Sequence, residues 1–261
     1  MLSRIAESLF WIGRYLERAE YTCRIVEVHL QLLLDDPSVD QDAAGQSLLE
    51  VMGCPPPEGS TADAQYVLTA LCYDAASPAS VAAALGGARE SARRARETVS
   101  TEMWEAINTT WNAVRGGRLQ RMRPASMFRS IKERTAVIAG ISDNTMSHDE
   151  GWHFLVLGRN LERADMTARL ITTAIASSGS AAAWANVLRG CGAHHAFIRT
   201  YGGTVNDRDA AEFLLLDRLF PRSLVFTLTA AEEALADLGQ TERRAGIEDA
   251  AQRLLGTARA E

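Results

Sequence analysis

The sequence predicts an all-α protein, a bundle of long helices, on three observations. Alanine, leucine and arginine dominate a composition that is only 7% aromatic, which favours helix. Apolar residues in the N-terminal segment recur at alternating spacings of three and four. No stretch alternates with a period of two for long enough to form a strand. With 261 residues, of which 47% are hydrophobic, the chain is long enough for one domain around a buried core.

The first predicted helix covers residues 2–33. Its apolar residues form a stripe typical of a helix packed lengthwise against another helix, and Asp35-Asp36-Pro37 ends it. The stripe consists of Leu2, Ile5, Leu9, Ile12, Leu16, Ala19, Cys23, Val26, Leu30 and Leu33. An irregular surface connection is predicted over residues 35–64, where Pro and Gly are frequent around a short helical piece near 42–52.

The rest of the chain is divided into helices by glycine and proline signals. Gly116-Gly117 stops one helix and Pro124 starts the next. Helices are predicted over residues 62–75, 78–85, 87–115, 124–146, 149–178, 181–200, 207–218 and 221–238. We expect all of them to belong to one domain over residues 1–261.

Two segments of the sequence repeat each other at an offset of 145 residues. The segment Gly13–Glu20 reads GRYLERAE, and Gly158–Asp165 reads GRNLERAD. We call the Glu-Arg pair in each segment, with the Arg three residues before its Glu, an ER motif. The repeat predicts two related helices of one bundle, but the sequence does not show whether they touch.

Each ER motif interrupts an apolar face of its predicted helix. The motif residues are Arg14, Glu17 and Arg18 in the first copy and Arg159, Glu162 and Arg163 in the second. Phe, Trp, Tyr and Met surround them on the same faces, so these charges are predicted to be buried or to line a cleft. Burying such groups without partners costs several kcal/mol each, so they must pair with one another or with a ligand.

Further arginines are predicted to join the ER motifs. Arg89, Arg93 and Arg96 are spaced to share one helix face, and Arg222 lies at a predicted helix start beside Pro221. Two arginines to each glutamate leave a surplus of positive charge, which suits a carboxylate, a phosphate or an acidic peptide end.

Three interpretations of the motifs remain open on the sequence alone. The charges form either a binding site for an anionic ligand or partner, or a structural network, such as that of an oligomerisation module. The third interpretation is an enzyme in which Glu17 or Glu162 acts as general base on an anionic substrate. A carboxylate among cations has a lowered pKa and is a poor base near neutrality, which disfavours this interpretation.

Composition and motifs argue against several other classes. A net charge of -6 argues against nucleic acid and anionic membrane as partners. The four cysteines lie far apart, and the His148/His153 and His194-His195 groups lack metal-ligand spacing, so no metal is expected. No cofactor motif is present, and neither a signal-peptide core nor a membrane span is predicted. We therefore expect a cytoplasmic protein, with self-association left open.

The sequence resembles the bacterial alpha-E family, helical proteins with a Glu-Arg motif. Four blocks in order carry the resemblance: Ala6–Glu20, Ser91–Glu105, Met146–Asp165 and Glu212–Ser223. The family usually has Asn at the position of Ser91, and its members usually extend further beyond the last block than Glu261.

The resemblance implies a context more than an activity. Alpha-E proteins are encoded beside, or fused to, a circularly permuted ATP-grasp protein, often with a transglutaminase-like protein nearby. ATP-grasp enzymes join a carboxylate to an amine. The resemblance therefore implies a non-catalytic accessory protein of a peptide- or amide-forming system, which binds the ligase, its peptide or carboxylate substrate, or both.

Overall fold

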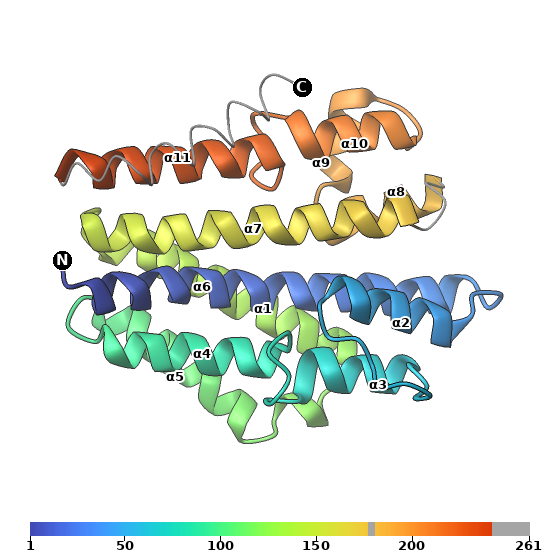
Figure 1. The fold of residues 1–261 in the computed structure, drawn as a ribbon, viewed down its shortest axis with the longest axis horizontal. Coiled ribbons are helices and arrows are strands. Elements are labelled where there is room, and N and C mark those ends of the chain that lie inside the picture. Colours follow the sequence, from blue (N-terminus) through green and yellow to red (C-terminus); the bar gives the residue numbers. More distant parts are fainter. Residues whose placement is uncertain (177–180, 242–261) are drawn as a thin grey trace.

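A computed structural model describes residues 1–176 and 181–241 of the chain, and these residues fold into helices without strands (Figure 1). The predicted all-α class is therefore confirmed for the described residues. The helices are α1 (Ser3–Asp35), α2 (Gln41–Val51), α3 (Ala64–Leu68), a π-helical turn (Thr69–Tyr73), α4 (Val81–Arg94), α5 (Thr101–Arg115), a 3-10 turn (Leu119–Arg121), α6 (Pro124–Thr145), α7 (Glu150–Ala176), α8 (Ala181–Gly190), α9 (His194–Tyr201), α10 (Asp207–Leu216) and α11 (Leu224–Thr241).

The two longest helices, α1 and α7, lie side by side in the middle of the molecule (Figure 1). Helix α11 packs along the other side of α7. Helix α4 packs along α1, and α5 packs against α4. Helix α6 crosses behind α1 in this view and contacts both α1 and α5. Because α1 has neighbours on several sides, the middle of its predicted stripe is buried, with Leu9, Ile12 and Val26 fully inaccessible, whereas Leu2 at its start is exposed.

The connection over residues 35–64 contains the short helix that the sequence predicts, and it contributes to the core. Asp40 caps α2 by accepting hydrogen bonds from the backbone N–H groups of Asp42 and Ala43. Leu49 of α2 is fully buried, and Gly45 lies so close to the backbone of Ala62 that no side chain fits between them. The helix thereby fixes the path of this connection.

The prediction of separate helices over 78–85 and 87–115 is wrong. Helix α4 continues through Gly86 and Gly87, and the chain breaks only at residues 95–100, where Ser100 caps α5. The glycines are there for packing. A Cβ atom at Gly87 would lie 2.7 Å from the ring of Tyr15, and one at Gly86 would lie 3.2 Å from the ring of Trp111. Two aromatic rings therefore rest directly on the α4 backbone, which a pattern of helix stop signals does not reveal.

The single helix predicted over 181–200 is also two helices. Gly192 has a φ of +65°, a left-handed conformation that ends the helical path after α8, and α9 begins at His194. Residues 177 and 178 of the helix predicted over 149–178 lie outside the described residues, as does the C-terminal end over 242–261.

Among the described residues, none of the helices combines the length and the apolar character needed to cross a membrane.

Candidate functional site: the paired ER motifs

The helices that carry the ER motifs pack against each other in parallel, in close backbone contact. A Cβ atom at Gly13 of α1 would overlap the carbonyl oxygen of Leu155 of α7, and one at Gly158 would overlap the carbonyl oxygen of Phe10. Leu155 and Gly158 lie 145 residues after Phe10 and Gly13, so the second contact repeats the first with the two helices exchanged, as in a pseudo-two-fold arrangement. The glycine before each motif therefore lets the two backbones approach closely enough for the charged side chains to meet.

Each ER motif supplies the partner of the other one. The Nε and Nη2 atoms of Arg18 donate to the two carboxylate oxygens of Glu162, at 2.5 and 3.0 Å. In the reciprocal pair, the same two atoms of Arg163 donate to the carboxylate of Glu17, both at 2.8 Å. Both pairs are bidentate, the geometry that gives the strongest arginine–carboxylate contacts. Since Glu17 and Arg18 project about 100° apart from α1, the pairs lie on the two flanks of the α1–α7 contact.

The two glutamates are buried, and their charges are balanced locally. The side chain of Glu162 is 0% exposed and that of Glu17 is 4% exposed. Burial raises the pKa of Glu17, but the charge and hydrogen bonds of Arg163, with the charges of Arg222 and Arg159, outweigh burial and hold this pKa below its ordinary value. The carboxylate is therefore ionised at neutral pH, and both of its oxygens accept hydrogen bonds from Arg163.

The first arginine of each motif makes fewer or longer hydrogen bonds than the second arginine does. Arg14 donates from Nε to Glu162 at 2.6 Å, and its two terminal nitrogens donate no hydrogen bond to the described residues. Its repeat counterpart, Arg159, donates among the described residues only to Asp143, at 3.4 and 3.5 Å. The side chains of Arg14 and Arg159 are 24% and 18% exposed. Each is therefore partly exposed beside a buried ion pair and is held by fewer or longer hydrogen bonds than Arg18 and Arg163 are.

Arg222 lies in the loop between α10 and α11 and contacts the first ER motif, as the sequence predicts. It donates from Nη2 to Glu20 at 2.6 Å, lies 3.5 Å from Glu17, and stacks over the ring of Tyr21 at 5.2 Å. The backbone of the same loop accepts hydrogen bonds from Arg163, at the carbonyl of residue 221, and from Thr167, at the carbonyl of residue 222. The link between α10 and α11 is thereby held against α1 and α7.

The other predicted arginines lie elsewhere, which corrects the sequence interpretation. Arg93 forms an exposed pair with Glu90 within α4, and Arg96 follows the end of that helix. Arg89 and Arg96 both stack over the ring of Trp104. The spacing of four and three residues between the three arginines gave the prediction, but α4 ends at Arg94, so Arg96 does not share a helix face with Arg89 and Arg93.

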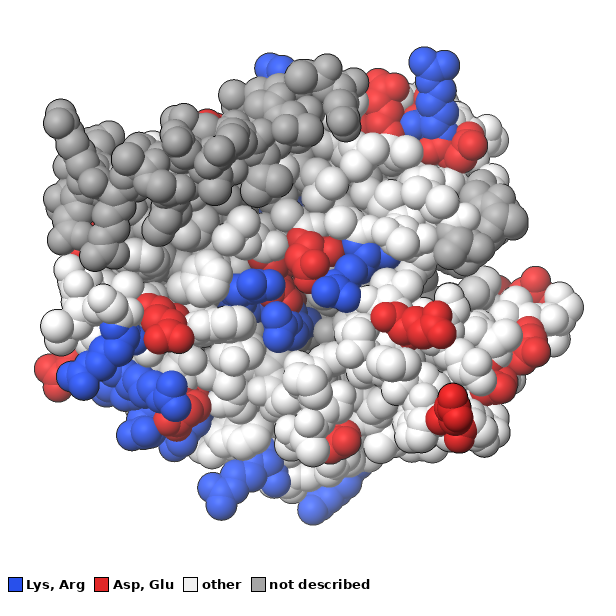
Figure 2. All heavy atoms as spheres, viewed as in Figure 1, with Lys and Arg blue, Asp and Glu red and all other residues white. Residues whose placement is uncertain are grey.

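The arginines of this cluster outnumber its carboxylates by two. The arginines are Arg14, Arg18, Arg24, Arg159, Arg163 and Arg222, and the carboxylates are Glu17, Glu20, Asp143 and Glu162. Figure 2 shows basic and acidic side chains gathered in the middle of one face, over the line where α1 and α7 run side by side. A small cavity of about 50 Å³, lined by Arg159, Arg163 and Glu17 among others, lies on the flank facing α6.

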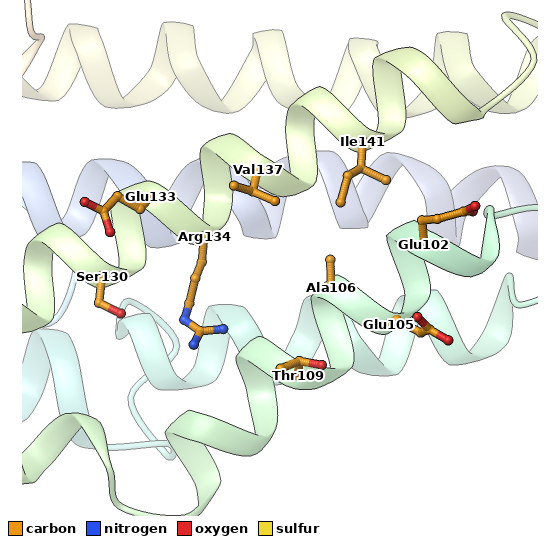
Figure 3. A pocket seen from close by; sticks show the side chains of 9 residues that line it. All are labelled: Glu102, Glu105, Ala106, Thr109, Ser130, Glu133, Arg134, Val137 and Ile141. Atoms are coloured by element: carbon orange, nitrogen blue, oxygen red, sulfur yellow. The ribbon is translucent and has the colours of Figure 1, made fainter.

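An open groove of about 600 Å³ lies apart from the ER motifs, between α5 and α6 (Figure 3). Val137 and Ile141 project into it from α6, and Val137 is 57% exposed. Glu102, Glu105 and Glu133 also line the groove, and none of the residues predicted from the sequence does. In the part of the chain that the structure describes, no three His, Cys, Asp or Glu side chains are grouped so as to hold a metal ion.

Comparison with known proteins agrees with the helical fold and the ER motifs described above. Residues 1–261 match the model of the Alpha-E family, described as a predicted alpha-helical domain with a conserved ER motif. Uncharacterized proteins of Mycobacterium bovis and Mycobacterium tuberculosis are each 24% identical to this chain over 269 residues. The alignment covers 90% of this chain but only 30% of each relative, so the relatives are far longer. No solved structure matches the chain with significance.

Proposed function

This chain belongs to the Alpha-E family, and we propose that it is a non-catalytic binding protein of a peptide- or amide-forming system. In this proposal, Arg14 on one flank of the α1–α7 contact and Arg159 on the other flank, facing α6, each hold a carboxylate of the partner or of its substrate. The enzyme that the protein serves is a circularly permuted ATP-grasp ligase, which the family resemblance suggests. The proposal places the protein in the cytoplasm, where such a ligase has ATP.

The proposal rests on the different hydrogen bonds that the two arginines of each motif make. Arg18 and Arg163 each use the Nε–Nη2 edge of the guanidinium group in a bidentate pair with a buried glutamate, so they are needed to join α1 to α7. Arg14 and Arg159 occupy equivalent positions of the repeat. Among the described residues, Arg14 is hydrogen-bonded through Nε alone, and Arg159 makes only two long contacts, both to one oxygen of Asp143. A purely structural pair requires one arginine for each glutamate, so the first arginine of each motif is available for recognition.

The local charge also favours an anionic partner. The cluster carries two surplus positive charges, whereas the whole chain has a net charge of -6. A carboxylate at this surface therefore meets attraction that the rest of the molecule does not offer. The aromatic rings of Phe10 and Trp11 beside Arg14, at 5.9 and 5.4 Å from its guanidinium carbon, hold this side chain in place without using its hydrogen-bond donors.

The geometry gives less support to an enzyme that uses the motif glutamates. A general base needs a pKa near the working pH and a free lone pair that faces its substrate. The pKa of Glu17 is lowered, and both of its oxygens accept from Arg163. Glu162 is fully buried under three arginine hydrogen bonds. The great length of the relatives also suits a module that works beside another catalytic domain.

The test is capture of the partner by an affinity-tagged chain from lysate of its native host, read by mass spectrometry. We expect the unsubstituted chain to recover an ATP-grasp protein. The Arg14→Gln/Arg159→Gln variant should lose it while keeping its helicity, with a lowered melting temperature but a folded state at the assay temperature, because Glu162 and Glu17 keep their bidentate pairs with Arg18 and Arg163.

A matched control separates recognition from a general loss of charge. Arg24 and Arg169 are also counterparts at the 145-residue offset, and each pairs with a carboxylate four residues away on its own helix. The Arg24→Gln/Arg169→Gln variant changes the net charge equally on the same two helices. If this control loses the ATP-grasp protein as fully as the test variant does, or if no ATP-grasp protein is captured by any form, the proposal is wrong.

A further inference from the structure

A second cavity, separate from the ER motifs, lies between the π-helical turn, α4 and the end of α5. Its volume is about 240 Å³, and none of the ER-motif residues lines it. Aromatic and aliphatic side chains form much of its wall, among them Tyr73, Trp111, Val114 and Leu119. An apolar cavity of about 150 Å³ binds benzene in another protein, so a cavity of this size accommodates a bicyclic aromatic ring.

Two backbone features shape this cavity. In the π-helical turn, Asp74 donates its backbone N–H to the carbonyl of Thr69, five residues back, so the turn holds one residue more than an α-helical turn does. Such turns occur frequently at functional sites, and this one carries Tyr73, a wall residue. On the other side, Gly86 lets the Trp111 ring lie directly on the α4 backbone, because a Cβ atom there would lie 3.2 Å from the ring.

One cation stands at this cavity. Arg115, in the last turn of α5, lines it and is exposed. Within residues 1–176 and 181–241, no carboxylate lies within ion-pair distance of Arg115, and its side chain donates no hydrogen bond there. An aromatic wall with a single free guanidinium group combines apolar contact with bidentate recognition of a planar anion.

We propose that this cavity binds an aromatic carboxylate, with the ring between Tyr73 and Trp111 and the carboxylate on Arg115. The proposal goes beyond the function proposed above and does not depend on it, since the residues are different. A carboxylate fits better than a phosphate, because one guanidinium edge matches its two oxygens and its single charge, and Arg115 is the one cationic residue among the described residues that line the cavity.

The experiment is calorimetric titration of the whole chain with 2-naphthoate and with its neutral analogue 2-naphthalenemethanol. We expect saturable binding of both probes, with 2-naphthoate binding more tightly. Arg115→Gln should weaken 2-naphthoate binding about fivefold or more and should leave the neutral probe almost unchanged. Arg118→Gln is the matched control, since Arg118 is exposed, three residues further on, and does not line the cavity. It should change neither affinity by more than about twofold.

Filling the cavity gives a second test. Ala82 is buried and lines the wall, so Ala82→Phe should abolish binding of both probes. Should that variant fail to fold, as judged by circular dichroism, Ala75→Trp narrows the cavity from an exposed position. Absence of saturable binding to the unsubstituted chain overturns the site. Binding that is insensitive to Arg115→Gln overturns the carboxylate, and binding that survives both filling variants places the probe elsewhere.

Discussion

Replacing Glu162 by Gln removes the charge at the centre of one reciprocal pair while keeping the shape of the side chain. The carboxylate accepts three hydrogen bonds, one from Arg14 and two from Arg18. A carboxamide offers one acceptor oxygen and turns an NH₂ group towards a guanidinium group. At least one donor therefore loses its partner, and two arginines keep their charge without a counter-ion.

The cost of this substitution follows from the burial of the pair. Removing one partner of a buried ion pair costs about 3–5 kcal/mol. The side chains of Arg14 and Arg18 are 24% and 22% exposed, so water recovers part of the lost interaction. We therefore expect Glu162→Gln to lower the free energy of unfolding by about 3 kcal/mol, at the lower end of that range. Urea unfolding followed by circular dichroism, with an unchanged m-value, measures this difference.

The control is Asp165→Asn on the same helix. Asp165 pairs with Arg169 four residues further on, and both side chains are more than a third exposed. Such pairs contribute about 0.3–0.5 kcal/mol, so Asp165→Asn should be nearly neutral. If Glu162→Gln costs less than about 1 kcal/mol, or no more than Asp165→Asn, then the ER motifs do not hold α1 to α7 and our reasoning is refuted.

Two further predictions concern the same pair of helices. Gly13→Ala should lower the free energy of unfolding by at least about 2 kcal/mol in urea titrations, because its Cβ would overlap a backbone carbonyl of α7 that has no room to move. Gly140→Ala is the control, since nothing lies within 4 Å of a Cβ there, and it should stabilise the protein by about 0.5–1 kcal/mol; equal effects would contradict the close backbone contact. His29 is buried, and burial lowers its pKa from 6.5 to about 4, so the folded state disfavours its cation. The contribution of neutral His29 to the free energy of unfolding is therefore fully present above pH 6.5 and is lost as the pH falls to about 4. The pKa difference corresponds to about 3 kcal/mol. His29→Leu should remove this part of the pH dependence in unfolding titrations between pH 7 and 4, and an unchanged profile would contradict the assignment.

The sequence predicted the central helix pair because its signals are local. The three-four spacing of apolar residues describes one helix face, and α1 is confirmed over almost the predicted length. The repeat also identified the charged residues that meet, since Glu17, Arg18, Glu162 and Arg163 all lie in the two motifs. Whether the motifs pair within themselves or with each other depends on which helices are neighbours, and no local spacing contains that information.

The errors arose where tertiary contacts override local signals. A break between two helices was predicted at Gly86, but aromatic rings from other helices pack on Gly86 and Gly87 and the helix continues. The interpretation of Arg93 and Arg96 as members of the cluster assumed that this helix extends further than it does. Glu20 and Asp143 were missed as partners of Arg222 and Arg159; Glu20 belongs to the repeated segment, which was a usable signal, while Asp143 gave none.

The capture experiment with Arg14→Gln/Arg159→Gln tests the central claim, that the first arginine of each ER motif recognises a carboxylate while the second holds the helices together. Our account predicts a variant that is folded at the assay temperature and no longer recovers the ATP-grasp protein, while Arg24→Gln/Arg169→Gln still does. Recovery of that protein by the Arg14/Arg159 variant at the level of the unsubstituted chain would contradict it.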